Sequence, residues 1–216
     1  MLEIINLNKS FVKGHYALDV LKDFCMKVEA GERVAIVGPS GAGKSTLLQI
    51  IGGLDKPDSG VIMFEGENIL EKKGKHLDRY RNDAVGFVFQ FHYLLEDFTA
   101  LENVMIPALI AGTGRAEAHD RAMELLTRVG LADRSTHFPT ELSGGEQQRT
   151  SIARALMNKP RMILADEPTG SLDKKNSEEV LSMFDIMKQD GITVLIVTHD
   201  EGIAGACDRK IEMEKS

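Results

Sequence analysis

The segment Gly38-Pro39-Ser40-Gly41-Ala42-Gly43-Lys44-Ser45 constrains the fold of this chain more than any other stretch. It matches the pattern G-x-x-x-x-G-K-[ST], for which a chain of this length offers on the order of 0.01 chance matches. An apolar run at residues 34–37 precedes it and a helical pattern follows. The glycines let backbone N–H groups surround phosphate oxygens, and the start of the following helix favours an anion. The segment therefore predicts a phosphate-binding loop rather than an ordinary glycine turn.

Two side chains at the end of this loop have predicted roles in binding a nucleotide. Lys44 can reach the β- and γ-phosphates, and the Ser45 hydroxyl can ligate Mg²⁺. A nucleoside triphosphate and Mg²⁺ are thus the expected substrate and cofactor.

A second signal is the apolar run Met162-Ile163-Leu164-Ala165, which ends in Asp166-Glu167. A buried strand would deliver both carboxylates to its C-terminal end, the edge at which α/β sheets bind ligands. Asp166 can hold Mg²⁺ directly or through water, and Glu167 can act as general base on an attacking water. Alone, such a pair is more often a strand that meets a turn. Beside a phosphate-binding loop, it predicts nucleotide hydrolysis.

A third signal is Leu142-Ser143-Gly144-Gly145-Glu146. Ser143 and Glu146 form a capping box, so a well-capped helix start with two flexible glycines is a strong structural alternative. The same segment would also create a second anion-binding helix start. One nucleotide needs only one phosphate site, so the second requires an explanation.

The hydrophobic pattern predicts an α/β fold with a mainly parallel sheet. Nearly continuous apolar runs at residues 33–37, 61–64, 85–89, 162–165 and 193–197 indicate buried strands, and helical patterns cover 44–51, 116–129, 146–158 and 176–188. Residues 2–7 and 24–28 indicate short antiparallel strands around a turn that contains Gly14. The segment from about 94 to 138 is predicted as a helical subdomain inserted into the core.

Composition excludes several classes of protein. The net charge of -7 argues against broad nucleic-acid binding. The two cysteines, Cys25 and Cys207, form no CxxC pair, so we expect neither a disulfide framework nor a zinc site. The first residues do not resemble a signal peptide, and no apolar run approaches the roughly 20 residues that span a bilayer. A role at a membrane would therefore require a separate membrane-spanning partner.

In this order, the three motifs resemble the Walker A, signature and Walker B motifs of ABC ATPases, and the resemblance covers nearly the whole chain. It implies a P-loop NTPase fold, an ABC cassette in which residues 1–216 form a single nucleotide-binding domain. It implies an ATPase that couples hydrolysis to transport as a translocase. Two cassettes would form an ATP-dependent homodimer, with each ATP between one phosphate loop and the other chain's signature segment. That pairing explains the second helix start.

The resemblance extends to single residues. Phe11 resembles the aromatic residue that stacks on adenine, although a core phenylalanine is a serious alternative. Gln90 resembles the glutamine that senses Mg²⁺ and the membrane partner, His199 resembles the switch histidine that contacts the γ-phosphate, and residues 171–173 resemble the loop that crosses the dimer. Glu146 stands where many members carry glutamine. The residues predicted to contact ATP are Phe11, Gly38, Pro39, Ser40, Gly41, Ala42, Gly43, Lys44, Ser45, Thr46, Ser143, Gly144, Gly145 and Glu146. The predicted Mg²⁺ ligands are Ser45, Gln90 and Asp166. The predicted catalytic residues are Glu167, His199 and Gln90.

Within the family, residues 90–104 and 165–173 resemble the lipoprotein-releasing (Lol) ATPases. Macrolide or peptide exporters and the cell-division ATPase are close alternatives. The Lol resemblance implies two transmembrane permease subunits, which would handle the lipoprotein cargo. The chain would then lie at the cytoplasmic face of a bacterial inner membrane, bound peripherally through the permease.

Tyr93, Leu94, Leu95 and Phe98 follow Gln90, where a permease would dock. Packing inside the helical subdomain is an equal alternative for each, because apolar side chains are usually buried. We expect Leu95 and Phe98 to form part of an exposed apolar groove. An ABC ATPase that acts on nucleic acid or ribosomes is a weaker reading, because the chain has one cassette, no heptad stretch and a negative charge. A kinase or GTPase would leave residues 142–146 unexplained.

Overall fold

The computed structural model describes residues 1–13 and 16–215, and the side chains of all of these except Lys13, Tyr16 and Ala17. The predicted turn at Gly14 lies outside the described residues. Among the described residues, no helix combines the length and the apolar character needed to cross a membrane.

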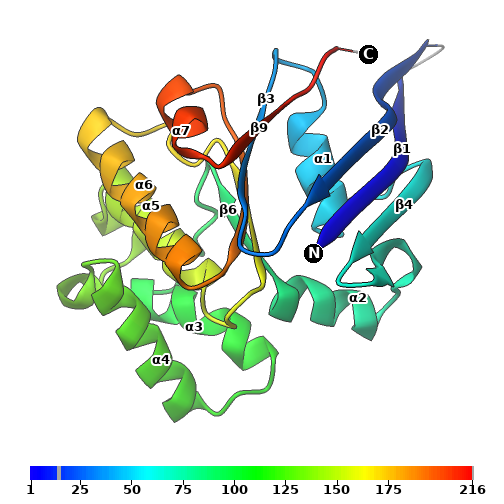
Figure 1. Ribbon diagram of the computed structural model, residues 1–216. Coiled ribbons are helices and arrows are strands. Elements are labelled where there is room, and N and C mark those ends of the chain that lie inside the picture. The colour runs from blue at the N-terminus through cyan, green and yellow to red at the C-terminus, as the bar shows by residue number, and fades with distance from the viewer. Residues whose placement is uncertain (14–15, 216) are drawn as a thin grey trace.

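A five-stranded parallel sheet forms the centre of the molecule (Figure 1). Its strand order is β6-β7-β8-β3-β9, and every neighbouring pair is parallel. The strands are β3 (Arg33–Val37), β6 (Val85–Phe89), β7 (Met162–Asp166), β8 (Thr193–Val197) and β9 (Arg209–Glu212). The first four confirm the predicted strands, and β7 is one residue longer than predicted. Strand β9 was not predicted.

Both faces of this sheet are buried, which explains the continuous apolar runs. Leu164 of β7 and Leu195 of β8 belong to one hydrophobic core, whereas Ile163 and Ile196 belong to the other. Helix α1 (Lys44–Ile51) and the antiparallel sheet cover the first face. Helices α5 (Gly144–Ala155), α6 (Lys174–Gln189) and α7 (Glu201–Ala206) cover the second.

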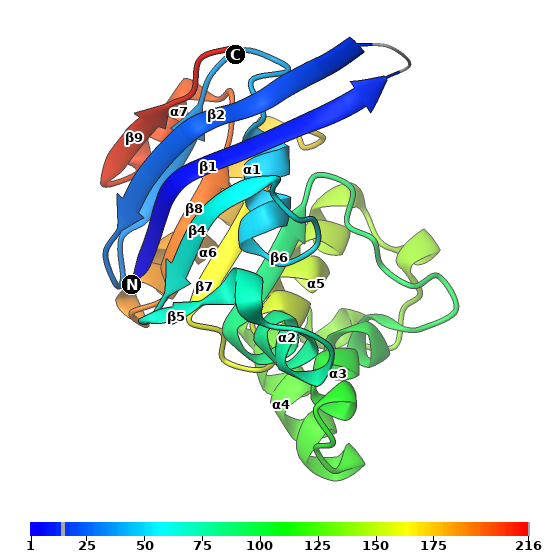
Figure 2. The same ribbon diagram turned by 90° about the vertical axis from the view of Figure 1, so that its right-hand side faces the viewer.

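The antiparallel sheet has the strand order β2-β1-β4-β5, and Figure 2 shows its long hairpin in front of α1. Strands β1 (Leu2–Lys13) and β2 (Tyr16–Val28) pair from Leu2 opposite Val28, so the predicted antiparallel strands are confirmed but are longer than expected. The others are β4 (Ser59–Phe64) and β5 (Glu67–Asn68).

The prediction that residues 61–64 join the parallel core was wrong. They lie in β4, which pairs antiparallel with β1. Ile62 and Phe64 are buried while Val61 and Met63 are only partly so, as expected for a strand with one covered face. The run of four apolar residues conceals this alternation.

Residues 94–138 contain helices α3 (Ala100–Ile110) and α4 (Arg115–Arg128) and no strand, as predicted. Their core is continuous with the second face of the parallel sheet, because Val104 and Leu125 join the same cluster as Ile163. Whether this part is a separate subdomain stays a prediction. Helix α2 (Lys75–Arg79), a π-helical turn at Tyr80–Ala84 and 3₁₀ turns at Ile69–Glu71, Ala132–Arg134 and Pro139–Glu141 complete the described elements.

Helix boundaries show the effect of capping. α1 begins and ends as predicted, and α4 is displaced by one residue at each end. α5 begins directly after its N-cap Ser143, two residues before the predicted start, and ends three residues early. α6 likewise starts after its N-cap Asp173, whose side chain accepts from the Asn176 amide.

Candidate active site

Four neighbouring strands bring the predicted catalytic segments to one edge of the parallel sheet. Phe89 of β6 lies opposite Asp166 of β7, and Asp166 lies opposite Val197 of β8. Because β3 and β8 are also in register, the phosphate loop after Val37 emerges beside His199. Gln90, Glu167, His199 and the loop therefore follow the C-terminal ends of adjacent strands, where α/β sheets bind ligands.

The phosphate loop depends on glycines at positions of close contact. Gly38 has a φ of 147°, and a Cβ there would lie 2.2 Å from Met213 O. Gly43 has a φ of 88°, and a Cβ there would lie 2.7 Å from Val20 of the β1–β2 hairpin. The loop is thus enclosed by backbone on two sides, and only glycine fits these positions without displacing a neighbour.

The Lys44 side chain folds back along the loop. Its Nζ donates to Gly38 O at 2.8 Å and to Pro39 O at 3.0 Å. This places a cation over the start of α1, where backbone N–H groups without helical partners also point outward. The combination suits a polyphosphate.

Ser45 and Asp166 meet although they lie far apart in sequence. Ser45 Oγ donates to Asp166 Oδ1 at 3.0 Å. Burial, and then the nearby Glu167 charge, raise the pKa of the Asp166 carboxyl, while Ser45 and Lys44 act in the opposite direction. A hydroxyl and a half-buried carboxylate are hard oxygen donors, the class that Mg²⁺ prefers, so these residues fit the predicted cation.

Glu167 directly contacts His199. His199 Nδ1 and Glu167 Oε2 are 2.9 Å apart, which joins the two residues predicted to act on the γ-phosphate and its attacking water. The backbone of Glu167 is left-handed, with a φ of 47°, a conformation that is unfavourable for a residue with a Cβ. Such strain costs roughly 1–2 kcal/mol and is typical of functional positions.

The Gln90 side chain lies against the segment that follows Glu167. A Cβ on Gly170 would be 3.1 Å from Gln90 Nε2, and Ser171 Oγ donates to Gln90 O at 3.4 Å. Gln90 is therefore close to the carboxylate pair, but no side-chain hydrogen bond to Asp166 or Glu167 occurs among the described residues. Its role as Mg²⁺ ligand stays a prediction.

Phe11 is exposed on the β1–β2 hairpin, with 44% of its surface accessible. The core alternative for this residue is therefore wrong. The Lys9 ammonium lies 4.8 Å from the ring centroid, and the same ammonium is held by Asp55. The hairpin that carries this ring also packs on Gly43, so the ring and the phosphate loop are connected through the same element.

The signature segment starts α5 as a capping box. The Glu146 amide donates to Ser143 Oγ, and the Ser143 amide donates to Glu146 Oε2. The hydrogen bond from the Ser143 amide, and then the Ser143 side chain and the ion pair with Arg134, lower the pKa of the Glu146 carboxyl, while burial acts in the opposite direction. A Cβ on Gly145 would lie 2.0 Å from Asn176 Oδ1, so this glycine lets α5 pack on the start of α6.

Ser143 and Gly144 are exposed, and in the part of the chain that the structure describes no hydrogen bond joins them to the phosphate loop. The fold thus brings together the predicted residues of the loop, the carboxylate pair, Gln90 and His199. It leaves the second helix start at a different place on the surface.

Three polar residues of the site region were not identified from the sequence. Gln148 is fully buried, and its Nε2 donates to Pro168 O at 2.6 Å, next to Glu167. Arg154 donates to His92 O at 2.8 Å and to Tyr93 O at 2.7 Å. Asn103 is also fully buried and bonds the backbone of Leu95 and Phe98. Helix α5 therefore connects the signature segment to the segments after Glu167 and Gln90.

The residues after Gln90 expose apolar side chains. Tyr93 is 65% accessible, Leu95 48% and Phe98 42%, while Leu94 is half-buried. The alternative that Tyr93, Leu95 and Phe98 fill the core of the helical part is wrong. They form an exposed apolar segment beside the candidate site.

Comparison with known proteins agrees with this geometry. Residues 21–170 match the ABC transporter family. Over 214 residues the chain is 54% identical to the "Lipoprotein-releasing system ATP-binding protein LolD" of Syntrophotalea carbinolica, covering 99% of this chain and 94% of the relative. It is 53% identical over 214 residues to the protein of the same name from Bacteroides thetaiotaomicron, covering 99% and 96%.

Two solved structures of one protein are similar throughout. The dimeric post-hydrolysis state of the ATP-binding cassette MJ0796 bound to ADP and Pi has a TM-score of 0.93 and 39% identity, covering 100% of this chain and 97% of that one. The dimeric structure of MJ0796, a bacterial ABC transporter cassette, has a TM-score of 0.93 and 40% identity, covering 100% and 95%. The α/β cassette fold predicted from the sequence is confirmed.

Proposed function

Because this chain belongs to the ABC transporter family of ATP-binding proteins, we propose that it drives the release of lipoproteins from a bacterial inner membrane. Its relatives of 54% and 53% identity are named for a lipoprotein-releasing system, and the likeness spans nearly the whole chain. The observation that carries the enzymatic part is the contact between Glu167 and His199 at the C-terminal edge of the sheet, next to the phosphate loop.

In the proposed reaction, Lys44 and the backbone of the phosphate loop bind the β- and γ-phosphates of ATP. Glu167 accepts a proton from the water that attacks the γ-phosphate, and His199 holds the Glu167 carboxylate in position through their 2.9 Å contact. Ser45 and Asp166 would hold Mg²⁺, whose positive charge stabilises the phosphate oxygens when it is bound. Gln90, which lies against Gly170, would detect the state of this site.

A second copy of the chain would complete the site. Ser143 and Gly144 are exposed, and within the described parts of the chain Glu146 is the one anionic group that caps their helix start. A triphosphate held by Lys44 of one copy could be contacted by this helix start in the other. ATP would then bridge two copies, and hydrolysis would remove the bridge.

The permease would dock on the exposed apolar segment formed by Tyr93, Leu95 and Phe98. Two transmembrane subunits, one for each copy of the chain, would place the ATPase at the cytoplasmic face of the membrane and would handle the cargo. The segment follows Gln90 by only a few residues, so a change at the nucleotide can reach the permease through a short stretch of backbone.

Substitution of Glu167 by glutamine tests the chemistry. We expect turnover to fall by roughly 10²–10⁴, the usual contribution of a general base, while ATP binding persists and two copies stay associated. In cells, this variant should co-purify with membrane subunits in the presence of ATP. Near-normal turnover of the variant would remove Glu167 from the proposed role.

Substitution of Gly144 by glutamate tests the second copy. Gly144 has ordinary backbone angles, and a Cβ there meets only Leu172 at 3.8 Å, so the single chain should fold. The added carboxylate should repel the partner's γ-phosphate. Retained ATP binding with loss of both ATP-dependent dimers and turnover is expected, and normal dimers would contradict the shared site.

A further inference from the structure

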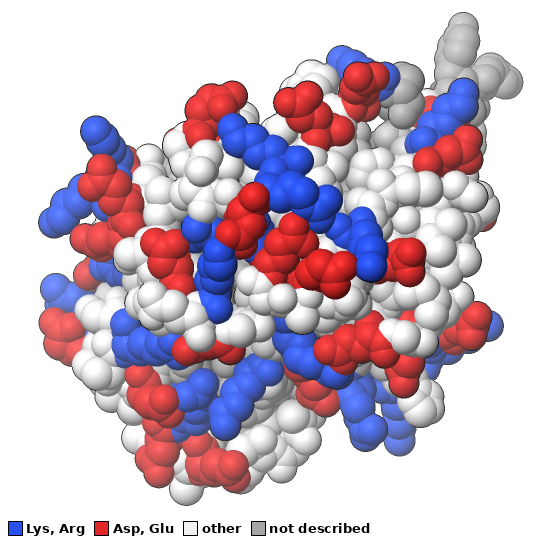
Figure 3. Space-filling view, viewed as in Figure 1, with Lys and Arg blue, Asp and Glu red and all other residues white. Residues whose placement is uncertain are grey.

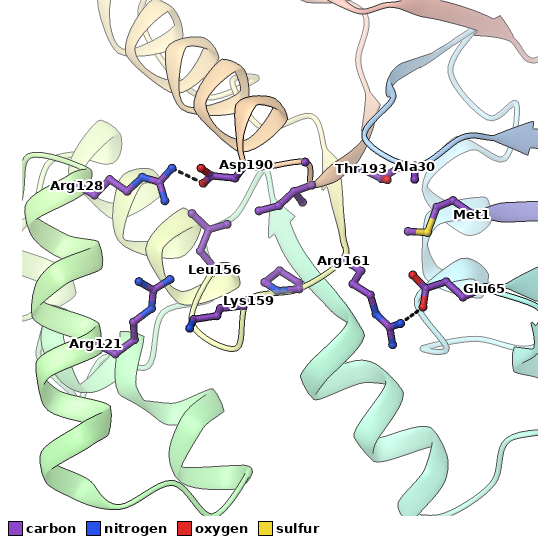
Figure 4. Close-up of a pocket in the computed structure, with 13 residues that line it drawn as sticks. Met1, Ala30, Glu65, Arg121, Arg128, Leu156, Lys159, Arg161, Asp190 and Thr193 are labelled. Atoms are coloured by element: carbon purple, nitrogen blue, oxygen red, sulfur yellow. Dashed lines mark hydrogen bonds and ion pairs between the residues drawn. The ribbon is translucent and has the colours of Figure 1, made fainter.

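A cavity separate from the candidate active site (Figure 4) lies at the opposite edge of the parallel sheet from Asp166 and the phosphate loop. It has a volume of about 440 Å³, within the usual range for small-molecule sites. Its walls come from α4, from the loop between α5 and β7, from the turn between α6 and β8, from Met1 before β1, and from the turns that contain Ala30 and Glu65. The five residues of β7 separate it from the candidate active site.

The charge of this cavity is opposite to that of the chain. Four basic residues line it, Arg121, Arg128, Lys159 and Arg161, against two acidic ones, Glu65 and Asp190. The lining therefore carries a formal charge of +2, in a chain with a net charge of -7. On the face shown in Figure 3, basic and acidic side chains are interspersed.

Two of the four cations are paired within the cavity and two are not. Arg128 pairs with Asp190, and Arg161 pairs with Glu65. Arg121 pairs with Glu124, which is outside the lining and whose charge also interacts with Lys159 and Arg128, and Lys159 forms no ion pair among the described residues. Figure 4 shows Arg121 and Lys159 on the same side of the cavity as the Arg128–Asp190 pair.

Arg121 and Lys159 are each held at an energetic cost. Arg121 Nε is buried and has no acceptor among the described residues. Lys159 has a left-handed backbone, with a φ of 52°, at a position where glycine would be unstrained. The Arg121 side chain is 24% accessible, so a dianion in the cavity can accept from the accessible part of its guanidinium and pair with Lys159.

We propose that this cavity binds a small organic phosphate, with the phosphate held by Arg121, Arg128 and Lys159. A phosphate monoester carries up to two negative charges, which matches the lining, and arginine forks suit its oxygens. Leu156, Pro160 and Ile192 line the same cavity and would contact the apolar part of the molecule. The proposal does not depend on ATP hydrolysis or on the nature of the cargo.

Such a ligand would connect two parts of the fold. Arg121 and Arg128 are on α4, whereas Lys159 precedes β7 of the central sheet. In this structure the Arg128–Asp190 ion pair links α4 with the turn before β8, and Ile192 of that turn packs against the hydrophobic cluster that includes Leu125 and Leu126 of α4. A ligand that contacts both sides favours arrangements in which α4 lies close to the sheet, and it would oppose any motion that separates them.

Phenyl phosphate is a suitable probe, and ¹⁵N-labelled protein can locate its binding. We expect saturable shifts of the amides of residues 156–159, 161 and 190–193, with a dissociation constant of about 1 mM or below. The amides of residues 38 and 40–45 report the phosphate loop separately. Phenyl sulfate, a monoanion, should bind more weakly at the cavity, and phenol should not bind.

Paired substitutions test the residues. Arg121→Ala with Lys159→Ala should weaken binding at the cavity by about tenfold or more, the effect of losing one or more charge-assisted hydrogen bonds. The matched control is Lys75→Ala with Arg79→Ala, which removes the same charge from α2, outside the cavity. The control should change the affinity by less than about twofold, because salt largely screens exposed charges that do not line the cavity.

A substitution that is expected to tighten binding keeps the test decisive if the double variant does not fold. Asp190 is exposed, and Asp190→Asn would release Arg128 and should tighten binding. The proposal is overturned if wild-type protein shows no saturable shift at the cavity, if the double variant and its control weaken binding equally, or if Asp190→Asn leaves affinity unchanged or lower.

Discussion

Replacing Arg154 by alanine should loosen the segment after Gln90 while leaving α5 folded. Each of the two hydrogen bonds from its guanidinium to His92 O and Tyr93 O has a charged donor, which is worth about 1.5–3 kcal/mol net. Together they hold this backbone with roughly 3–6 kcal/mol. His92 is half-buried and Tyr93 is exposed, so water can replace part of the loss. We expect the local opening free energy to fall by about 2–4 kcal/mol.

Amide hydrogen exchange measures this loss. The Leu95 amide donates to Asn103 Oδ1 at 2.8 Å and lies two residues beyond Tyr93. Its exchange should accelerate by up to about 30- to 700-fold, the equivalent of 2–4 kcal/mol. The Glu102 amide, which donates to the N-cap Thr99 of α3, is the internal control and should not change. Arg154→Lys should give an intermediate effect, because one ammonium does not reproduce the two-pronged contact.

The functional consequence should appear in coupling more than in basal hydrolysis. Both of the Arg154 hydrogen bonds described above go to backbone carbonyls of the segment proposed to dock the permease. Stimulation of ATP turnover by the permease should therefore fall more than turnover of the isolated chain. If Leu95 exchange is unchanged while the melting temperature drops, Arg154 stabilises α5 and does not position this segment.

Three further outcomes follow from contacts of the candidate site. Capping holds the pKa of Glu146 below its ordinary value. The Glu146 carboxylate therefore stabilises the fold above its unfolded-state pKa of about 4.3, and this stabilisation is lost as the pH falls through its folded-state pKa. In urea titrations from pH 6 to 3, Glu146→Gln should lose less stability than wild type, and parallel curves would contradict this. Gly145→Ala should destabilise the chain by about 1–3 kcal/mol, because the added Cβ would lie 2.0 Å from Asn176 Oδ1. A second substitution in the same chain, Asn176→Ala, should restore part of this stability, and absence of rescue in thermal melts would refute the clash. Phe11→Ala should raise the KM for ATP and for GTP alike by about tenfold, with little change in kcat. Stacking is worth about 1–3 kcal/mol per base and does not distinguish adenine from guanine by their hydrogen-bonding edges. A change in kcat alone would exclude stacking.

Sequence reasoning located the candidate site because its chemistry lies in short segments that are each bound to one element. Lys44 and Ser45 follow one strand, and Asp166 and Glu167 end another. The carboxyl ends of parallel strands share an edge, so predicting the strands was enough to predict that these residues meet. The 3.0 Å bond from Ser45 to Asp166 is the direct result.

Which strand pairs with which could not be predicted from the sequence in the same way. The run at residues 61–64 reads like a parallel-core strand, yet its partner is β1. Strand β9 has only one half-buried residue, Ile211, and lacks the apolar run that marks the inner strands. Its position beside β3 is nevertheless what brings Met213 O against Gly38. Edge strands carry a weak hydrophobic signal, so sequence patterns miss them.

The roles of Arg154 and Asn103 could not be assigned because each depends on tertiary structure: a distant hydrogen-bond partner for Arg154 and complete burial for Asn103. An arginine near the end of a helix reads as a solvent-exposed residue, and nothing local indicates that it contacts backbone 61 and 62 residues away. Asn103 lies inside α3, where asparagine is an ordinary surface residue, but it is completely buried. A buried polar group must be paired, and here the pairing is with an irregular segment.

These two anchors also explain why apolar side chains can remain exposed after Gln90. Arg154 fixes the backbone at His92 and Tyr93, and Asn103 fixes it at Leu95 and Phe98. The segment therefore holds its shape without burying Tyr93, Leu95 or Phe98. A partner that docks there meets a surface whose backbone is already ordered, so little conformational entropy is lost on binding and more of the apolar contact contributes to affinity. The same rigidity would carry a displacement of Gln90 to the partner, whereas a flexible segment would absorb it.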